Sequence, residues 1–171
     1  MRYNVYMSAK NDPANDLSAP DGSQEVVWNE RYATGIDLID EQHKELILLT
    51  NRLYQACRDG NEAASTVFKE AMSRMVEYVR FHFAAEEKLQ GRLKYPQLGE
   101  HKKQHEDMVK HILGAANDFK EGKNSVPFNF ARSLKDWILS HIAIYDKAIA
   151  VYVADLKKKG LISDDDLKIE P

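Results

Sequence analysis

The sequence predicts an all-α protein, an up-down-up-down antiparallel four-helix bundle preceded by an N-terminal extended loop. Glycine and proline residues divide most of the chain into four long segments. Apolar side chains in each segment recur at steps of three and four residues, the spacing that keeps them on one face of a helix. No segment shows the strict alternation of apolar and polar residues that is typical of a strand. Amphipathic helices with short connections favour an antiparallel bundle.

The predicted elements follow one another between short breaks. Residues 1–24 are rich in Asn, Asp, Ser, Ala, Pro and Gly, so we expect a flexible extension there, followed at 25–35 by a loop that carries Trp28 and Tyr32. The bundle domain is expected to span 25–160, with helices at 36–59, 62–90, 96–121 and 127–159. The last helix ends in three lysines, where the helix dipole favours positive charge. We expect residues 161–171 to form a loose acidic tail.

Length and composition exclude several classes of protein. The 171 residues fit one domain, and the single cysteine, Cys57, forms no disulfide within the chain and is expected to be a small core residue. The formal net charge of −3 argues against nucleic acid as a partner. No apolar run approaches the roughly 18 residues of a membrane span, and the N-terminus lacks the apolar core of a secretory signal. We therefore expect a cytoplasmic protein without a membrane span, and the sequence identifies no protein partner.

Histidines occupy positions on the apolar stripes where a bundle favours Leu or Ile. Seam positions make up about two of every seven residues, so five histidines placed at random would all fall there with a probability of about 0.002. The five that do are His43, His82, His101, His105 and His141. The sixth, His111, lies roughly 240° around the helix from His105 and is expected in solvent. A lone buried histidine is usually a hydrogen-bonded core residue, but five of them indicate a shared role.

Two carboxylates accompany these histidines on the same faces. The relevant pairs are His82 and Glu86, four residues apart, His101 and His105 at the same spacing, and His141 and Asp146, five apart. A buried carboxylate is unfavourable unless it is paired or bound to a cation. A metal site would satisfy all seven side chains. The alternative is a buried hydrogen-bonded network without a metal, which would have to satisfy five imidazoles and two carboxylates without water.

The step from His141 to Asp146 also carries a geometric prediction. Five residues of an ideal α-helix turn through about 500°, which leaves the two side chains about 140° apart. They would not then point equally at one site. A π-type turn between them would bring them closer, and such turns are frequent at functional sites.

The ordered set of seven side chains resembles that of the hemerythrins, specifically the bacteriohemerythrins. The resemblance covers residues 26 to about 157 and includes the stretches 28–43, 81–87, 95–101 and 137–142. It implies that His101, His105 and His141 hold one iron ion, and that His43 and His82 hold the other. It further implies that Glu86 and Asp146 bridge the two iron ions together with an oxo or hydroxo group.

That assignment predicts a function by counting ligands. Three nitrogens, two carboxylate oxygens and the bridging oxygen fill an octahedron around one iron, whereas its neighbour keeps one open position. An open position on a redox-active metal is where a small ligand binds, and dioxygen fits. We expect reversible dioxygen binding for storage or delivery and no enzyme activity beyond a low level. The alternatives are an oxygen or redox sensor, and a diiron peroxidase or oxidase.

Two residues beside the predicted ligands are candidates for the dioxygen pocket. Gln90 stands where the family pattern usually has methionine, four residues past Glu86; it faces either the diiron cavity or solvent. Tyr145 lies four residues past His141 and on its face, where packing or a hydrogen bond is favoured over iron ligation.

Overall fold

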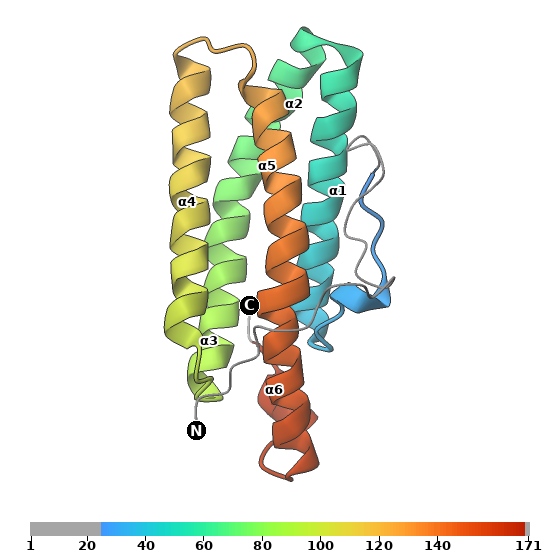
Figure 1. Ribbon diagram of the computed structural model, residues 1–171, viewed down its shortest axis with the longest axis vertical. Coiled ribbons are helices and arrows are strands. Elements are labelled where there is room, and N and C mark those ends of the chain that lie inside the picture. Colours follow the sequence, from blue (N-terminus) through green and yellow to red (C-terminus); the bar gives the residue numbers. More distant parts are fainter. Residues whose placement is uncertain (1–24, 170–171) are drawn as a thin grey trace, which may run out of the picture.

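The computed structural model describes residues 25–169 and has four antiparallel helical runs (Figure 1). The first is α1 (Asp37–Asp59), and the second joins α2 (Asn61–Tyr78), the π-helix η3 (Val79–Phe83) and α3 (Ala84–Arg92). The third is α4 (Leu98–Lys120), and the fourth joins α5 (Val126–Ser140), the π-helix η4 (His141–Asp146) and α6 (Lys147–Lys158). The described residues contain no strand. The predicted four-helix bundle is confirmed.

The helix boundaries follow the glycine and proline signals to within two residues. Gly122 and Gly160, just beyond α4 and α6, adopt φ angles of 82° and 68°, which residues with a Cβ rarely adopt. Pro127 lies in the first turn of α5, where its missing N–H has no intrahelical partner to lose. Lys157 and Lys158 lie in the last turn of α6, as predicted.

Apolar side chains fill the bundle on both sides of a polar layer. The larger cluster includes Leu46, Leu53, Phe68, Phe130 and Leu134. The smaller cluster includes Ile36, Ile39, Leu89, Ile149 and Val153. Along each helical run the predicted metal ligands lie between members of the two clusters. Packing on either side therefore fixes the level at which these polar side chains meet.

The segment before α1 is held against that helix by side chains. Asn51 pairs with the backbone of Val26, accepting from its N–H at 2.9 Å and donating to its carbonyl at 2.8 Å. Asp40 accepts from the backbone N–H of Thr34 at 2.7 Å and of Gly35 at 3.1 Å. These bonds set the direction in which α1 begins, nearly two turns before His43.

The C-terminal segment corrects one prediction. Residues 161–169 were expected to be loose, but they contain the 3-10 helix η5 (Asp164–Leu167), which begins with a capping box between Ser163 and Asp166. Leu167 is buried in the smaller apolar cluster, and Arg92 donates to the carbonyls of Asp166 and Lys168. Leu167, with Ile162 and Ile169 packed against the same cluster, and this arginine outweigh the acidic composition of the segment. The predictions for residues 1–24 and 170–171 lie outside the described residues.

One of the described helical runs is apolar enough to cross a membrane by length and composition alone. The best 18-residue window of Val126–Lys158 has a mean hydropathy of 1.2. A core helix of a bundle passes the same test, and this run carries the polar pair His141 and Asp146 on its buried face. We therefore assign no membrane span.

Candidate metal centre

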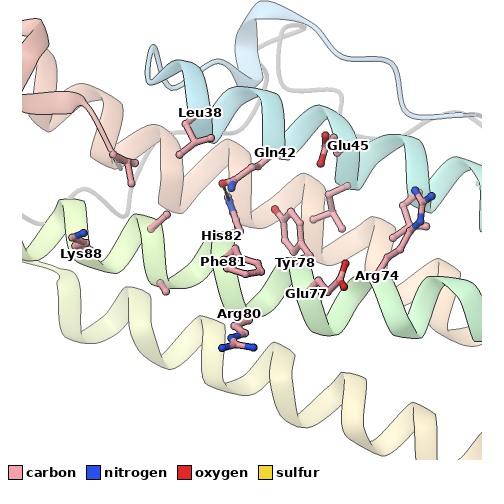
Figure 2. Close-up of a pocket in the computed structure, with 15 residues that line it drawn as sticks. Leu38, Gln42, Glu45, Arg74, Glu77, Tyr78, Arg80, Phe81, His82 and Lys88 are labelled. Atoms are coloured by element: carbon pink, nitrogen blue, oxygen red, sulfur yellow. Dashed lines mark hydrogen bonds between the residues drawn. The ribbon is translucent and has the colours of Figure 1, made fainter. Parts of the chain in front are cut away.

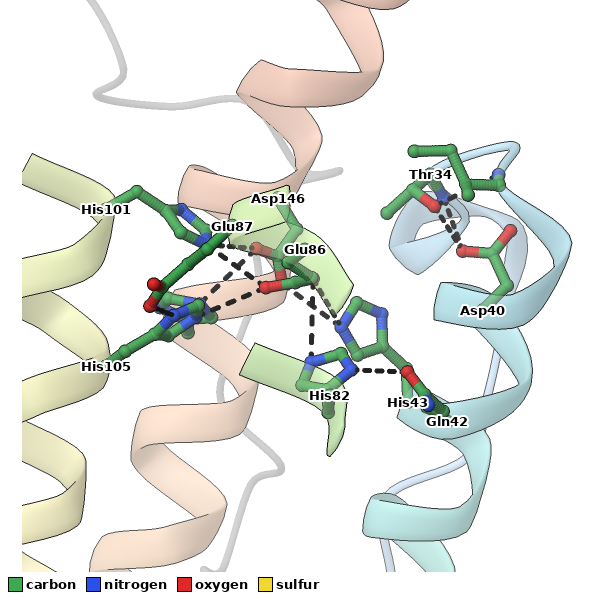
Figure 3. A network of polar contacts seen from close by, with 12 residues as sticks. Thr34, Asp40, Gln42, His43, His82, Glu86, Glu87, His101, His105 and Asp146 are labelled. Carbon is green, nitrogen blue, oxygen red and sulfur yellow. Dashed lines mark hydrogen bonds and ion pairs between the residues drawn. The ribbon is translucent and has the colours of Figure 1, made fainter. Parts of the chain in front are cut away.

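All four helical runs contribute to one buried cluster of polar side chains (Figure 3). Its members are His43 from α1, His82 from η3, Glu86 from α3, His101 and His105 from α4, and His141 and Asp146 from η4. None of the seven is more than 3% exposed. The structure thus brings together every residue that the sequence predicts as a metal ligand.

The carboxylate of Glu86 lies between two groups of histidines. Its Oε1 lies 3.5 Å from the Nε2 of His82 and 3.6 Å from that of His43. Its Oε2 lies 3.1 Å from the Nε2 of His101 and 3.2 Å from that of His105. Each oxygen of this one carboxylate therefore faces a different group.

Asp146 divides the histidines in the same way. Its Oδ2 lies 3.2 Å from the Nε2 of His43, while its Oδ1 lies 3.3 Å from that of His141 and 3.7 Å from that of His101. We call His43 and His82 the pair, and His101, His105 and His141 the trio. Both carboxylates present one oxygen to the pair and the other to the trio.

The π-helix η4 accounts for the five-residue step to Asp146. The segment His141–Asp146 forms π-type turns within an otherwise α-helical run, as predicted from the spacing. The wider turn brings Asp146 back toward the face that carries His141. A second π-helix, η3, contains His82 and was not predicted, because the four-residue step from His82 to Glu86 fits an ordinary α-helix.

Several buried polar atoms of the cluster have no hydrogen-bond partner among the described residues. They are both carboxylate oxygens of Asp146, both ring nitrogens of His43 and the Nδ1 atoms of His101 and His141. Native proteins rarely leave such atoms unsatisfied. The donor atoms of the trio and Glu86 all lie within 4.8 Å of one another. The same is true of the donor atoms of the pair and Glu86. Imidazole and carboxylate donors suit iron and similar ions, so the residues fit a metal cofactor.

The two histidines of the pair have pKa values that are shifted in opposite directions. Burial lowers the pKa of His43, but the nearby carboxylates of Asp146 and Glu86 outweigh it and raise this pKa to about 9. Burial dominates at His82 and lowers its pKa to about 3 despite the charge of Glu86. A cation at this position would replace the proton that His43 otherwise holds.

Two further polar side chains orient the cluster, and the sequence reasoning assigned no role to either. The Nδ1 of His82 lies 2.9 Å from the Oε1 of Gln42, and the Nδ1 of His105 lies 3.1 Å from the Oε1 of Glu87. Both partners are acceptors, so each neutral imidazole carries its proton on Nδ1 and turns the Nε2 lone pair inward. The sequence signal that could have identified them is their position next to predicted ligands, because Gln42 precedes His43 and Glu87 follows Glu86.

Aromatic rings stack on three of the imidazoles. Phe83 lies parallel to His105 with ring centroids 3.7 Å apart, and Trp137 lies against His141 at 4.3 Å. Tyr78 stacks on His82 at 4.5 Å. These contacts restrict rotation of the imidazoles about their side-chain bonds and so help to hold the donor atoms in place.

The two candidate pocket residues differ in burial. Gln90 is 1% exposed, which excludes the solvent-facing alternative, and neither atom of its amide has a partner among the described residues. Tyr145 is half-buried and stacks on His141 at 5.5 Å, in agreement with a packing role. Cys57 is half-buried against the larger apolar cluster. His111 is exposed, as predicted, and lies 2.7 Å from the Oγ of Ser133.

A groove of about 770 Å³ between α1 and the α2–α3 run reaches the cluster from outside (Figure 2). Gln42, Tyr78 and His82 line it, together with apolar side chains that include Leu38 and Phe81. Gln42 and one member of the pair, His82, therefore both border the groove. The trio has a different boundary, where Glu87 bonds to His105 and forms an ion pair of 3.2 Å with Lys102.

Comparison with known proteins gives the family. The family described as the hemerythrin HHE cation binding domain matches residues 34–151. A bacteriohemerythrin from Stenotrophomonas maltophilia is 32% identical over 125 residues, which cover 73% of this chain and 79% of the relative. A bacteriohemerythrin from Methylococcus capsulatus is 28% identical, with 68% and 86% covered, and a hemerythrin-like protein from Naegleria gruberi is 27% identical, with 79% and 92% covered. The chain therefore belongs to the hemerythrin family.

Proposed function

We propose that the cluster holds two iron ions and binds dioxygen reversibly, for storage or delivery. The observation that carries this proposal is the division of both carboxylates between the pair and the trio. A carboxylate that presents one oxygen to each of two groups of nitrogen donors is placed to bridge two metal ions. In this assignment Glu86 and Asp146 are the bridging residues, completed by an oxo or hydroxo group, and the histidines hold the ions from either side.

The unequal number of histidines determines where a ligand would bind. The trio supplies three nitrogens to one position, whereas His43 and His82 supply two to the other. Two iron ions bound there would supply the open coordination position, next to the pair, and the electrons that reversible dioxygen binding requires. This chain provides the rest, namely a layer of buried donor side chains held between the two apolar clusters.

The two buried threonines outside the cluster give no support to an enzyme. Outside the seven predicted ligands, the buried polar side chains of the described part are Thr34, Thr50, Gln90 and Lys135. Thr50 donates to the carbonyl of Leu46 within α1, and Thr34 to Asp40 before it. Neither threonine donates to a predicted ligand, so neither is placed to transfer a proton within the cluster.

Iron analysis and optical spectroscopy test the proposal. Protein purified without oxygen is expected to contain two iron ions per chain, and admission of air is expected to give an oxygenated absorption band that disappears under argon and returns in air. The His111→Ala variant serves as the control and should behave like the wild type. Immediate conversion to the oxidised form would favour the sensor or the enzyme instead, and an iron content below one per chain would contradict the assignment.

A further inference from the structure

The five imidazoles of the cluster differ at the ring nitrogen that faces away from the carboxylates. The Nδ1 atoms of His43, His101 and His141 have no partner among the described residues. His82 and His105 each have one, so a single supported imidazole lies in the pair and a single one in the trio. The two partners are not equivalent, because one is a neutral amide and the other a carboxylate.

A carboxylate partner changes a metal-ligating imidazole more than an amide does. It attracts the Nδ1 proton, shifts electron density toward Nε2 and makes that nitrogen a stronger donor to a cation. Glu87 holds its Oε1 against His105 while its Oε2 pairs with Lys102. Lys102 is 46% exposed, so water screens its charge. The His105 ring is buried, so its interaction with the Glu87 carboxylate is screened less. Gln42 offers His82 a carbonyl dipole only.

We propose that Glu87 and Gln42 widen the difference between the two metal positions beyond the three-to-two division of the histidines, so that the trio binds a cation first and holds the higher oxidation state more strongly. Glu87 acts through His105 and is thus a positioning residue that also tunes its donor strength. This inference rests on the proposed function, because it requires two metal positions. It concerns the order in which they fill and the potential at which each is oxidised.

Titration of the metal-free protein with cobalt(II) tests the order. We expect two binding steps in the wild type, followed by the optical bands of the bound ion. Glu87→Gln should weaken the first step by roughly 10- to 100-fold, the usual effect of losing the partner of a ligating histidine. Gln42→Glu should strengthen the second step. The double variant, which conserves net charge, should bring the affinities of the two steps closer together, and His43→Ala and His141→Ala assign each step to the pair or the trio.

Two controls separate this effect from a general change in charge or packing. Glu106→Gln removes the same charge from an exposed position on α4 and should leave both steps unchanged. Lys102→Ala removes the ion pair but keeps the carboxylate on His105, so it should not weaken the first step. Equal effects of Glu87→Gln and Lys102→Ala would show a structural role and overturn the inference.

The reduction potential of the iron-loaded protein supplies a second measurement. If Glu87 and Gln42 had only structural roles, their variants would not shift this potential in opposite directions. Glu87→Gln should raise the potential of the trio position, and Gln42→Glu should lower that of the pair, with each tenfold change in relative affinity for the two oxidation states equal to about 59 mV. Two cobalt steps of unchanged affinity and order in every variant would overturn the inference while leaving the proposed function intact. Binding of fewer than two ions by the wild type would overturn both.

Discussion

Helices α4 and η4 each supply two side chains to the cluster, but they do so with different backbones. His101 and His105 lie four residues apart on a regular α-helix, so their rings meet on one face with centroids 4.3 Å apart. His141 and Asp146 lie five residues apart, and the chain between them is π-helical. In these two elements the local backbone matches the spacing of the functional side chains, whereas η3 shows that a four-residue step is also compatible with a nearby π-helix.

The largest expected effect comes from deleting one exposed residue in each element. Deletion of Lys103 from α4 rotates every later residue by about 100° and takes Met108 and Ile112 out of the core, so we expect a loss of more than about 5 kcal/mol in the free energy of unfolding. Deletion of Ile144, which is 57% exposed, removes the extra residue of η4 and leaves the face of α6 in register. We expect a change of about 1 kcal/mol or less there.

Urea unfolding of the metal-free proteins, followed by circular dichroism, measures both deletions. The comparison holds if the Ile144 deletion folds cooperatively with near-native stability and the Lys103 deletion does not. Equal destabilisation would mean that the π-helix is an integral part of the packing and does not simply accommodate one additional residue between His141 and Asp146.

The second prediction concerns the carboxylate that joins α4 to the pair. Glu86→Ala removes the acceptor that faces the pair through one oxygen and His101 and His105 through the other. A ligand at a thousand times its dissociation constant stabilises the folded state by about 4 kcal/mol, and the variant should lose that increment together with its iron. Calorimetry with and without metal measures the effect.

The matched control is His111→Ala, because His111 is the one histidine outside the cluster. It should keep both the iron and the melting temperature of the wild type. If Glu86→Ala and His111→Ala melted alike with metal present, the cluster would not be the metal centre.

The sequence was sufficient for the fold because periodicity and helix punctuation are local signals. It also located the seven clustered side chains, since polar residues on an apolar stripe stand out, and it predicted the π-turn at Asp146 from spacing alone. It missed η3, because the four-residue step from His82 to Glu86 already fits an ordinary α-helix and so gives no sign of a wider turn. It missed the contacts of Gln42 and Glu87, because a side chain on one helix that supports a ring on another depends on tertiary packing.

The C-terminal segment differs from its prediction for the same physical reason. Acidic composition predicted a loose tail, but docking depends on a few long-range contacts. Leu167 enters an apolar cluster, and Arg92, 74 residues from Asp166 in the sequence, binds its carbonyl. No local pattern contains that information.

The smallest expected effect tests the surroundings of the cluster beside α4 and η4. Gln90 follows Glu86 by one helical turn, and its amide is buried without a partner among the described residues. Leaving such a group unsatisfied costs about 1 kcal/mol or more, so Gln90→Met should stabilise the metal-free protein by about 1 kcal/mol. Urea unfolding measures this directly. A loss of stability would instead mean that the amide has a partner, such as an ordered water.

The same variant tests whether Gln90 affects bound dioxygen. An amide has four hydrogen-bonding sites, and the apolar residues around α3 offer few partners. We therefore expect an ordered water to form the missing hydrogen bonds of Gln90. In the proposed function, water near the open position would supply the protons with which the bound ligand leaves as hydrogen peroxide, carrying one electron from each iron ion and leaving both oxidised. The oxygenated absorption band should therefore decay more slowly in Gln90→Met than in the wild type at fixed pH and temperature. Unchanged decay would place Gln90 away from the dioxygen pocket, whereas faster decay would show that the amide stabilises the bound ligand by donating a hydrogen bond.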